Sequence, residues 1–165
     1  MKIKTFRLFL PMFLVFTLVS CSTDSNENNV APVAQLITNY NSSEDEIELA
    51  RLINEYRVSK GFNELQIINH ISFKAQEHNL YMIERNVVNH DNFENRANNI
   101  MQVLGAVKVG ENIAYNYSTP NAALASWIDS PNHKENLDGD YTHFGISIST
   151  SPTGKDYYTA IFMKR

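Results

Sequence analysis

The chain contains a single cysteine, Cys21, among its 165 residues. One cysteine cannot form a disulfide within the chain, so we expect core packing alone to stabilise the fold. Basic residues are also in the minority, with 14 Lys and Arg against 18 Asp and Glu, and the net charge is −4. An acidic protein lacks the positive surface that nucleic acid or anionic lipid headgroups require, so we expect no nucleic-acid partner.

A long membrane-spanning apolar run is also missing. The N-terminal run, Leu8 to Val19, is about a dozen residues long and follows a basic start. A transmembrane helix needs about 20 such residues, and this pattern is typical of a signal peptide, which we place at residues 1–20. Cys21 stands where bacterial lipoproteins are acylated, and we expect it to be lipidated. The alternative is an ordinary small residue near a standard cleavage site.

The mature chain divides into a tether and one domain. Residues 21–42 are rich in Asn, Ser and Asp, a composition that predicts a lipid-anchored flexible tether. Residues 43–165 show no internal repeat and have the size of one domain. Acyl chains on Cys21 would attach the protein to a membrane of the cell envelope. Because Ser22 provides no aspartate retention signal, we expect the outer membrane or the cell surface rather than the inner membrane.

A capping box begins the first predicted helix. The side chain of Ser43 can accept the amide of Glu46, whose carboxylate can reach back to the Ser43 amide. Apolar residues then recur at helical spacing, which predicts a buried face. That face comprises Ile47, Ala50, Ile53 and Tyr56.

Further helices follow from apolar periodicity and from start and stop residues. They are predicted over residues 70–85, over residues 92–104, and from Pro120 to just before Pro131. In the first of these, His78 lies on the apolar stripe, and we interpret it as a core histidine whose hydrogen bonds are satisfied. His70, at the start of the same helix, is interpreted as a surface residue. Trp127 lies on the apolar face of the last helix.

Strands are predicted in the C-terminal half. Residues 144–149 alternate apolar and small or polar side chains, Ser151-Pro152-Thr153-Gly154 suits a turn, and residues 157–163 are rich in β-forming types. These features predict a hairpin. A short strand is predicted around residues 107–113. Helices followed by mixed elements and a hairpin favour an α+β fold over a βαβ repeat.

Two motifs carry a resemblance to a known family. They are Gly110-Glu111-Asn112-Ile113 and Trp127-x-x-Ser130-Pro131-x-His133-x-x-Asn136-Leu137, and a terminal strand with Gly145 follows them. In this order they resemble the CAP superfamily (SCP domain), which groups cysteine-rich secretory proteins, antigen 5 and pathogenesis-related proteins, and above all its short bacterial lipoprotein branch. The resemblance implies a three-layer α-β-α sandwich with a central, mainly antiparallel sheet.

The resemblance also implies a surface cleft lined by two histidines and usually two acids. His90 and His133 match the histidines, and Glu111 matches the acid of the Gly-Glu-Asn motif. Animal members usually place a glutamate where this chain has Ser130. Asp129 is one residue away and is a weaker candidate for that position.

The residue types allow several chemistries. Two imidazoles and one carboxylate suit a three-ligand zinc site with an open position, or a general acid–base group. Alternatively, Glu111 accepts backbone amides and His133 caps a helix end, so that both only organise loops. His143, just before a strand, could line the same cleft. We do not expect Ser130 to be a nucleophile, because no Gly-x-Ser-x-Gly elbow is present and Pro131 constrains the approach.

We therefore expect a non-catalytic, envelope-anchored module. Its cleft would bind a divalent metal such as zinc, or a small ligand, with lipid among the ligands that the family resemblance implies. Its loops would contact an extracellular partner. One alternative is a hydrolase that activates water with the His/Glu cluster, and another is a purely structural hydrogen-bond network.

Overall fold

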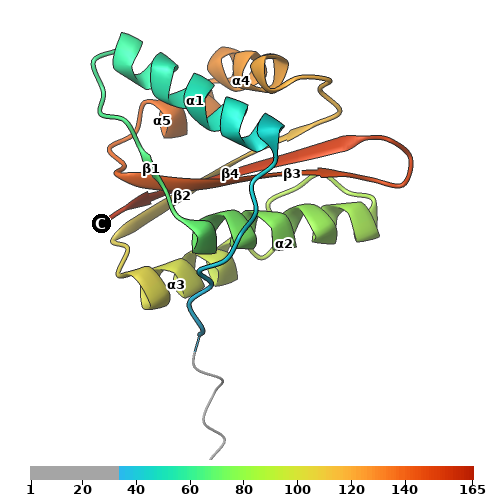
Figure 1. Cartoon of the computed structure of the whole chain (residues 1–165), viewed down its shortest axis with the longest axis horizontal. Helices are drawn as coiled ribbons and strands as arrows, with labels where there is room; N and C mark the ends of the chain where they lie inside the picture. Colours follow the sequence, from blue (N-terminus) through green and yellow to red (C-terminus); the bar gives the residue numbers. More distant parts are fainter. Residues whose placement is uncertain (1–33) are drawn as a thin grey trace, which may run out of the picture. The chain divides into compact units, whose positions relative to one another are not determined.

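The computed structural model describes residues 34–165 (Figure 1). Within this range the elements are α1 Glu44–Ser59, β1 Gln66–Ile67, α2 Asn69–Arg85, α3 Phe93–Leu104, β2 Lys108–Tyr115, α4 Pro120–Asp129, α5 Pro131–Leu137, β3 His143–Thr150 and β4 Asp156–Lys164. The predicted signal peptide, Cys21 and the first part of the predicted tether lie outside the described residues. None of the helices in the described range is long and apolar enough to cross a membrane.

One sheet forms the middle of the domain, with strand order β1-β3-β4-β2. The predicted hairpin of β3 and β4 is confirmed, and β2 pairs with β4 in antiparallel orientation. Only β1 is parallel to its neighbour, and it pairs with β3 through Gln66 and Ile67 alone. A two-residue strand leaves too little alternation to be recognised in a sequence. The predicted α+β class with a mainly antiparallel sheet is confirmed.

Helices cover both faces of the sheet (Figure 1). Successive residues of a strand point to opposite faces, and neighbours in β4 show this clearly. Phe162 packs into the core beneath α1 and α4, whereas Ile161 packs against α2 and α3. Helix α5 lies on the same side as α1 and α4. This is the predicted three-layer arrangement.

The predicted start of α1 is confirmed, but its buried face is rotated. Ser43 Oγ accepts the Glu46 N–H at 3.2 Å, and Glu46 Oε2 accepts the Ser43 N–H at 2.9 Å. Ile47 was predicted to be buried and is 55% exposed, whereas Leu49 is fully buried. The periodicity misled because charged residues also face inwards. The second oxygen of Glu46, Oε1, accepts the Ile148 N–H of β3 at 2.8 Å.

The predicted end of α4 before Pro131 is also confirmed, but a second helix begins there. Ser130 is extended, with φ −93° and ψ 117°, and Pro131 occupies the first turn of α5. Proline stops one helix because it disfavours helical backbone at the residue before it and lacks the amide proton that the next turn would need. It suits the first turn of the next helix, where an amide proton has no intrahelical partner. Helix α5, which the sequence did not predict, carries His133 and Asn136.

The end of the predicted tether is docked on the domain. The N–H of Ile37 donates to His70 Nδ1 at 3.1 Å. The hydroxyl of Tyr40 donates to Glu46 Oε1 at 2.8 Å and to Ser147 Oγ at 3.0 Å. The prediction of His70 as a surface residue is wrong, because the ring is fully buried beneath this segment.

Candidate functional site

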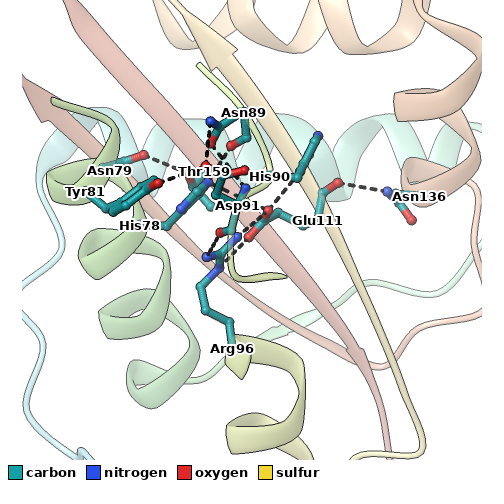
Figure 2. A network of polar contacts seen from close by, with 10 residues as sticks. All are labelled: His78, Asn79, Tyr81, Asn89, His90, Asp91, Arg96, Glu111, Asn136 and Thr159. Carbon is teal, nitrogen blue, oxygen red and sulfur yellow. Dashed lines mark hydrogen bonds and ion pairs between the residues drawn. The ribbon is translucent and has the colours of Figure 1, made fainter. Parts of the chain in front are cut away.

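Glu111 is the centre of a polar cluster on the face of the sheet that α2 and α3 cover (Figure 2). In β2, Glu111 pairs with Ile161 of β4, and its carboxylate is buried. Arg96 of α3 binds both carboxylate oxygens, with Nη2 to Oε1 at 2.8 Å and Nε to Oε2 at 2.9 Å. This fork-shaped pairing is the strongest form of an arginine–carboxylate contact and fixes the carboxylate plane.

His90 lies in the loop between α2 and α3, and its side chain is 48% exposed. Its Nδ1 lies 2.8 Å from Glu111 Oε1. An ionised carboxylate only accepts hydrogen bonds, so Nδ1 carries the proton. A neutral His90 ring therefore presents Nε2 as an acceptor. Glu111 thus fixes both the tautomer and the orientation of this half-exposed imidazole.

Arg96 is the member of the cluster that sequence reasoning missed. Besides its two bonds to Glu111, its Nη1 donates to the main-chain oxygen of Asp91 at 2.6 Å. Arg96 therefore holds both the carboxylate that binds His90 and the backbone next to His90. The sequence contained a sign of this role, because Arg96 lies next to Ala97 on the buried face of the predicted helix. A charge at such a position needs a buried partner.

The charge state of Glu111 follows from these contacts. Burial alone would raise the pKa of Glu111, but the hydrogen bonds from His90 and Arg96 and the charge of Arg96 outweigh burial. The pKa of Glu111 is therefore held below its ordinary value. The carboxylate stays ionised at neutral pH, which is the state that orients His90.

His78 of α2 lies beside this cluster in the interior. Its Nε2 donates to the main-chain oxygen of Asn89 at 2.8 Å and lies 3.9 Å from Glu111 Oε1. Its Nδ1 has no hydrogen-bond partner among the described residues. The predicted burial is confirmed, but the prediction of a satisfied ring is wrong. Burial lowers the pKa of His78, and in the neutral ring the unpartnered atom is a lone pair.

The Gly-Glu-Asn motif joins both faces of the sheet at the edge strand β2. A Cβ on Gly110 would lie 2.4 Å from the Tyr141 hydroxyl and 2.5 Å from Asn136 Oδ1, so only glycine allows this approach. Asn136 Nδ2 donates to the main-chain oxygen of Glu111 at 3.1 Å. Asn112 Nδ2 in turn donates to the main-chain oxygen of His133 at 2.9 Å. These bonds hold α5 against the strand that carries Glu111.

His133 is carried by α5, whose backbone is bonded to this edge strand. The ring is partly buried. Its pKa is lowered first by burial and then by the charge of His90. His90 comes from the loop after α2, and His133 comes from α5. The structure thus brings His90 into contact with Glu111, and it holds α5, which carries His133, against the strand of Glu111.

The two weaker candidates lie apart from this group. Asp129 is the exposed last residue of α4, and within residues 34–165 it makes no hydrogen bond or ion pair with the cluster. His143 begins β3, which β4 separates from β2. Its Nδ1 bonds Thr142 Oγ1 at 2.8 Å, and its pKa is lowered by burial and by Arg165 rather than by a member of the cluster.

The geometry does not suit the predicted three-ligand zinc site. In the part of the chain that the structure describes, no group of three or more His, Cys, Asp or Glu side chains is arranged to hold a metal ion. Both oxygens of Glu111 are bound by Arg96, and a guanidinium at that place would repel a dication. Glu111 is therefore a support for His90 rather than a ligand. The imidazoles of His90 and His133 remain as candidate metal ligands.

A family model described as the Cysteine-rich secretory protein family (CAP) matches residues 50–162. Two curated relatives come from Bacillus subtilis. The uncharacterized protein YkwD is 27% identical over 145 residues, which are 82% of this chain and 56% of that protein. The uncharacterized membrane protein YlbC is 42% identical over 59 residues, which are 35% of this chain and 16% of that protein. The matched regions therefore cover little more than half, or less, of these relatives.

Solved structures share the fold. An outer surface protein from Borrelia burgdorferi superposes with a TM-score of 0.68 at 22% identity, over 78% of this chain and 99% of that one. An extracellular protein containing a SCP domain from Bacillus anthracis gives a TM-score of 0.65 at 24% identity, over 73% of this chain and 40% of that one. At these identities the likeness shows the fold alone.

Proposed function

Because the chain belongs to the cysteine-rich secretory protein family, we propose that it is an envelope-anchored, non-catalytic binding module. Its ligand site is the surface formed by the rings of His90 and His133, and its ligand is a small molecule or a divalent metal. The observation that carries this proposal is the 2.8 Å bond between His90 Nδ1 and Glu111. It holds a half-exposed imidazole with its other nitrogen ready to accept.

Preorganisation is the physical reason for a binding role. Arg96 fixes Glu111, and Glu111 fixes His90, so a ligand need not order the ring when it binds. A histidine that ligates a metal usually donates its other N–H to a carboxylate, as His90 does. Zinc sites with slow exchange use three or four protein ligands. With only His90 and His133 as ligands, we expect weak and exchangeable metal binding.

Zinc titration by calorimetry tests the site. At pH 7.5 we expect binding by the parent and at least about a tenfold loss in both His90→Ala and His133→Ala, because each removes one of two ligands. At pH 5.5 binding should weaken, since both rings must be neutral to ligate. His143→Ala is the matched control and should bind like the parent. If the parent binds no zinc, the metal-binding part of the proposal is wrong, and the purely structural hydrogen-bond network becomes the better explanation of the cluster.

The envelope location is supported by the sequence and by the names of two similar structures. One is called an outer surface protein and the other an extracellular protein. The predicted signal peptide would deliver this chain to the envelope, and a lipidated Cys21 would anchor it at the outer membrane or the cell surface. Fractionation of cells that express Cys21→Ala tests the anchor. We expect the variant to leave the membrane pellet, and full retention there would contradict lipidation.

One observation favours a second candidate, a hydrolase that activates water. A carboxylate that holds the Nδ1 proton of a histidine is the arrangement that prepares Nε2 as a general base. In that case Glu111→Gln would abolish hydrolysis of a model ester or peptide, because the neutral amide no longer stabilises the protonated ring. Hydrolysis no faster than the buffer control in the parent would eliminate this candidate.

A further inference from the structure

A buried histidine far from the candidate site fastens the N-terminal segment to the domain. His70, at the start of α2, is fully buried. Its Nδ1 accepts the main-chain N–H of Ile37 at 3.1 Å, and its Nε2 lies 2.8 Å from Asn99 Oδ1 of α3. A backbone amide can only donate, so Nδ1 must carry no proton while this contact exists. The docked segment therefore requires the neutral ring.

We propose that His70 is a pH-sensitive latch, which holds the segment around Ile37 while the ring is neutral and releases it when the ring is protonated. A proton on Nδ1 would set two N–H groups against each other at hydrogen-bond distance, which is unfavourable. The Ile37 amide must then move away. The site lies apart from the His90 and His133 surface, so the latch does not depend on ligand binding there.

Neighbouring contacts define how far the release would run. Thr38 is held by an exposed hydrogen bond, in which its main-chain oxygen accepts from Asn69 Nδ2 at 2.6 Å. Tyr40 is held by Glu46 and Ser147, and neither of these side chains bonds His70. The opening therefore ends at Tyr40. Each released residue adds up to about 3.5 Å to the chain between the domain and the predicted anchor.

The charges around His70 set the direction of the switch. Burial lowers its pKa most, the hydrogen bond that Nε2–H donates to Asn99 opposes this, and Lys74 and Glu77 act in opposite senses. Lys74 and Glu77 are also paired with each other, at 2.7 Å. Helix α3 contributes the uncharged Asn99 at this bond, and the docked segment contributes main chain. The docked ring therefore stays neutral below the ordinary histidine pKa of about 6.5, whereas the released ring takes up a proton there, so the latch weakens as pH falls below that value.

Hydrogen exchange on the full chain tests this proposal at the Ile37 amide. Protection, corrected for the intrinsic pH dependence of exchange, should fall by up to about fivefold between pH 6.5 and 5.5, because the released ring, with an ordinary pKa of about 6.5, takes up a proton over this range. His70→Asn keeps an acceptor near the Nδ1 position but cannot titrate, and it should abolish this dependence. His143→Asn, which alters a second partly buried histidine, should leave the dependence intact.

The amide of Ile161 in the central strand β4 serves as an internal reference, because it reports global opening. If Ile37 protection in the parent is the same at both pH values, or if His70→Asn shows the same fall as the parent, His70 is not a latch. If Ile161 falls together with Ile37, the change is global unfolding and the proposal also fails. A fall confined to the segment, present in the parent and absent in His70→Asn, supports it.

Discussion

The two faces of the central sheet are built differently. Beneath α1 and α4 the core is one continuous apolar cluster around Trp127, Phe144 and Phe162. Beneath α2 and α3 the apolar side chains form two separate clusters. One lies around Ile71, Ile100 and Ile161, and the other comprises Met82, Ile113 and Tyr157.

A band of polar residues lies between those two clusters. In β4 it is Thr159, between Tyr157 and Ile161, and in α2 it is His78 and Asn79. In β2 it is Glu111, which lies between Val109 and Ile113 on the same face of the strand and pairs with Ile161. Asn79 satisfies both neighbours in the band, because its Oδ1 accepts from Thr159 Oγ1 at 2.7 Å and its Nδ2 donates to the Ser147 oxygen at 2.9 Å.

This difference explains where the candidate site lies. Buried polar groups are tolerated only with partners, so a polar band needs a specific network, whereas an apolar core needs only matching volumes. The face beneath α2 and α3 lacks a continuous apolar core, and its polar network orients the His90 imidazole at the edge of the sheet. The other face provides the stability that allows this. The contrast predicts different responses to substitution on the two faces.

The largest effect is expected from Trp127→Ala on the apolar face. The side chain is fully buried, and its Nε1 donates to the Ile113 oxygen at 2.8 Å. Truncation leaves a large cavity and an unpaired carbonyl, at a cost of about 3–5 kcal/mol. Urea unfolding followed by circular dichroism measures it. Because no disulfide is possible in the chain, we expect the variant to be largely unfolded at 37 °C. An unchanged midpoint would show that this face is not the main source of stability.

The next effect is expected from Arg96→Met in the polar band. Loss of the guanidinium leaves the buried Glu111 carboxylate without its cation, at a cost of about 3 kcal/mol at pH 8. Burial then acts with less opposition and raises the pKa of Glu111, so the carboxyl takes up a proton as pH falls. The destabilisation should therefore shrink between pH 8 and pH 5, unlike that of Trp127→Ala. Unfolding curves at both pH values measure this.

A double variant separates charge from packing in the same experiment. Arg96→Met combined with Glu111→Leu removes both charges and should recover most of the lost stability. NMR of the His90 ring should then show loss of the fixed Nδ1–H tautomer in the double variant. If the double variant is no more stable than Arg96→Met, the cost comes from lost packing and not from the unpaired charge.

The smallest effect is expected from Ile47→Ala on α1. Sequence periodicity places this residue in the core, whereas the structure leaves it 55% exposed. Surface substitutions usually change stability by less than about 0.5 kcal/mol. Leu49→Ala is the matched control on the same helix and should cost about 2–5 kcal/mol, because Leu49 is fully buried. Equal losses in the two variants would contradict the rotated face of α1.

The sequence predicted those elements whose signals are local. The capping box at Ser43, the stop before Pro131 and the β3–β4 hairpin depend on neighbouring residues, and each is confirmed. Errors occurred where a buried charge replaced an apolar residue. Glu46 faces inwards because it caps α1 and also binds the β3 backbone. Periodicity weighs apolar residues only, and it therefore placed Ile47 in the core.

The candidate site shows the same division. Motifs and family resemblance indicated His90, Glu111 and His133 and implied the fold, which the structure confirms. They could not show that Arg96 binds both oxygens of Glu111, because that pairing joins α3 to β2. The predicted role of Glu111 as a metal ligand depended on its carboxylate being free. Whether the site binds a ligand stays a prediction.

By itself the sequence determined the α+β class, the places of the four longer helices and of the hairpin, and the absence of an internal disulfide, since each follows from residue types or from spacing along the chain. The tertiary structure alone decided which charges are buried together and which ring nitrogens are left to accept. The Arg96–Glu111–His90 network and the contact between His70 and Ile37 join segments from different elements. Such contacts depend on how helices pack on the sheet, and no local pattern encodes that packing.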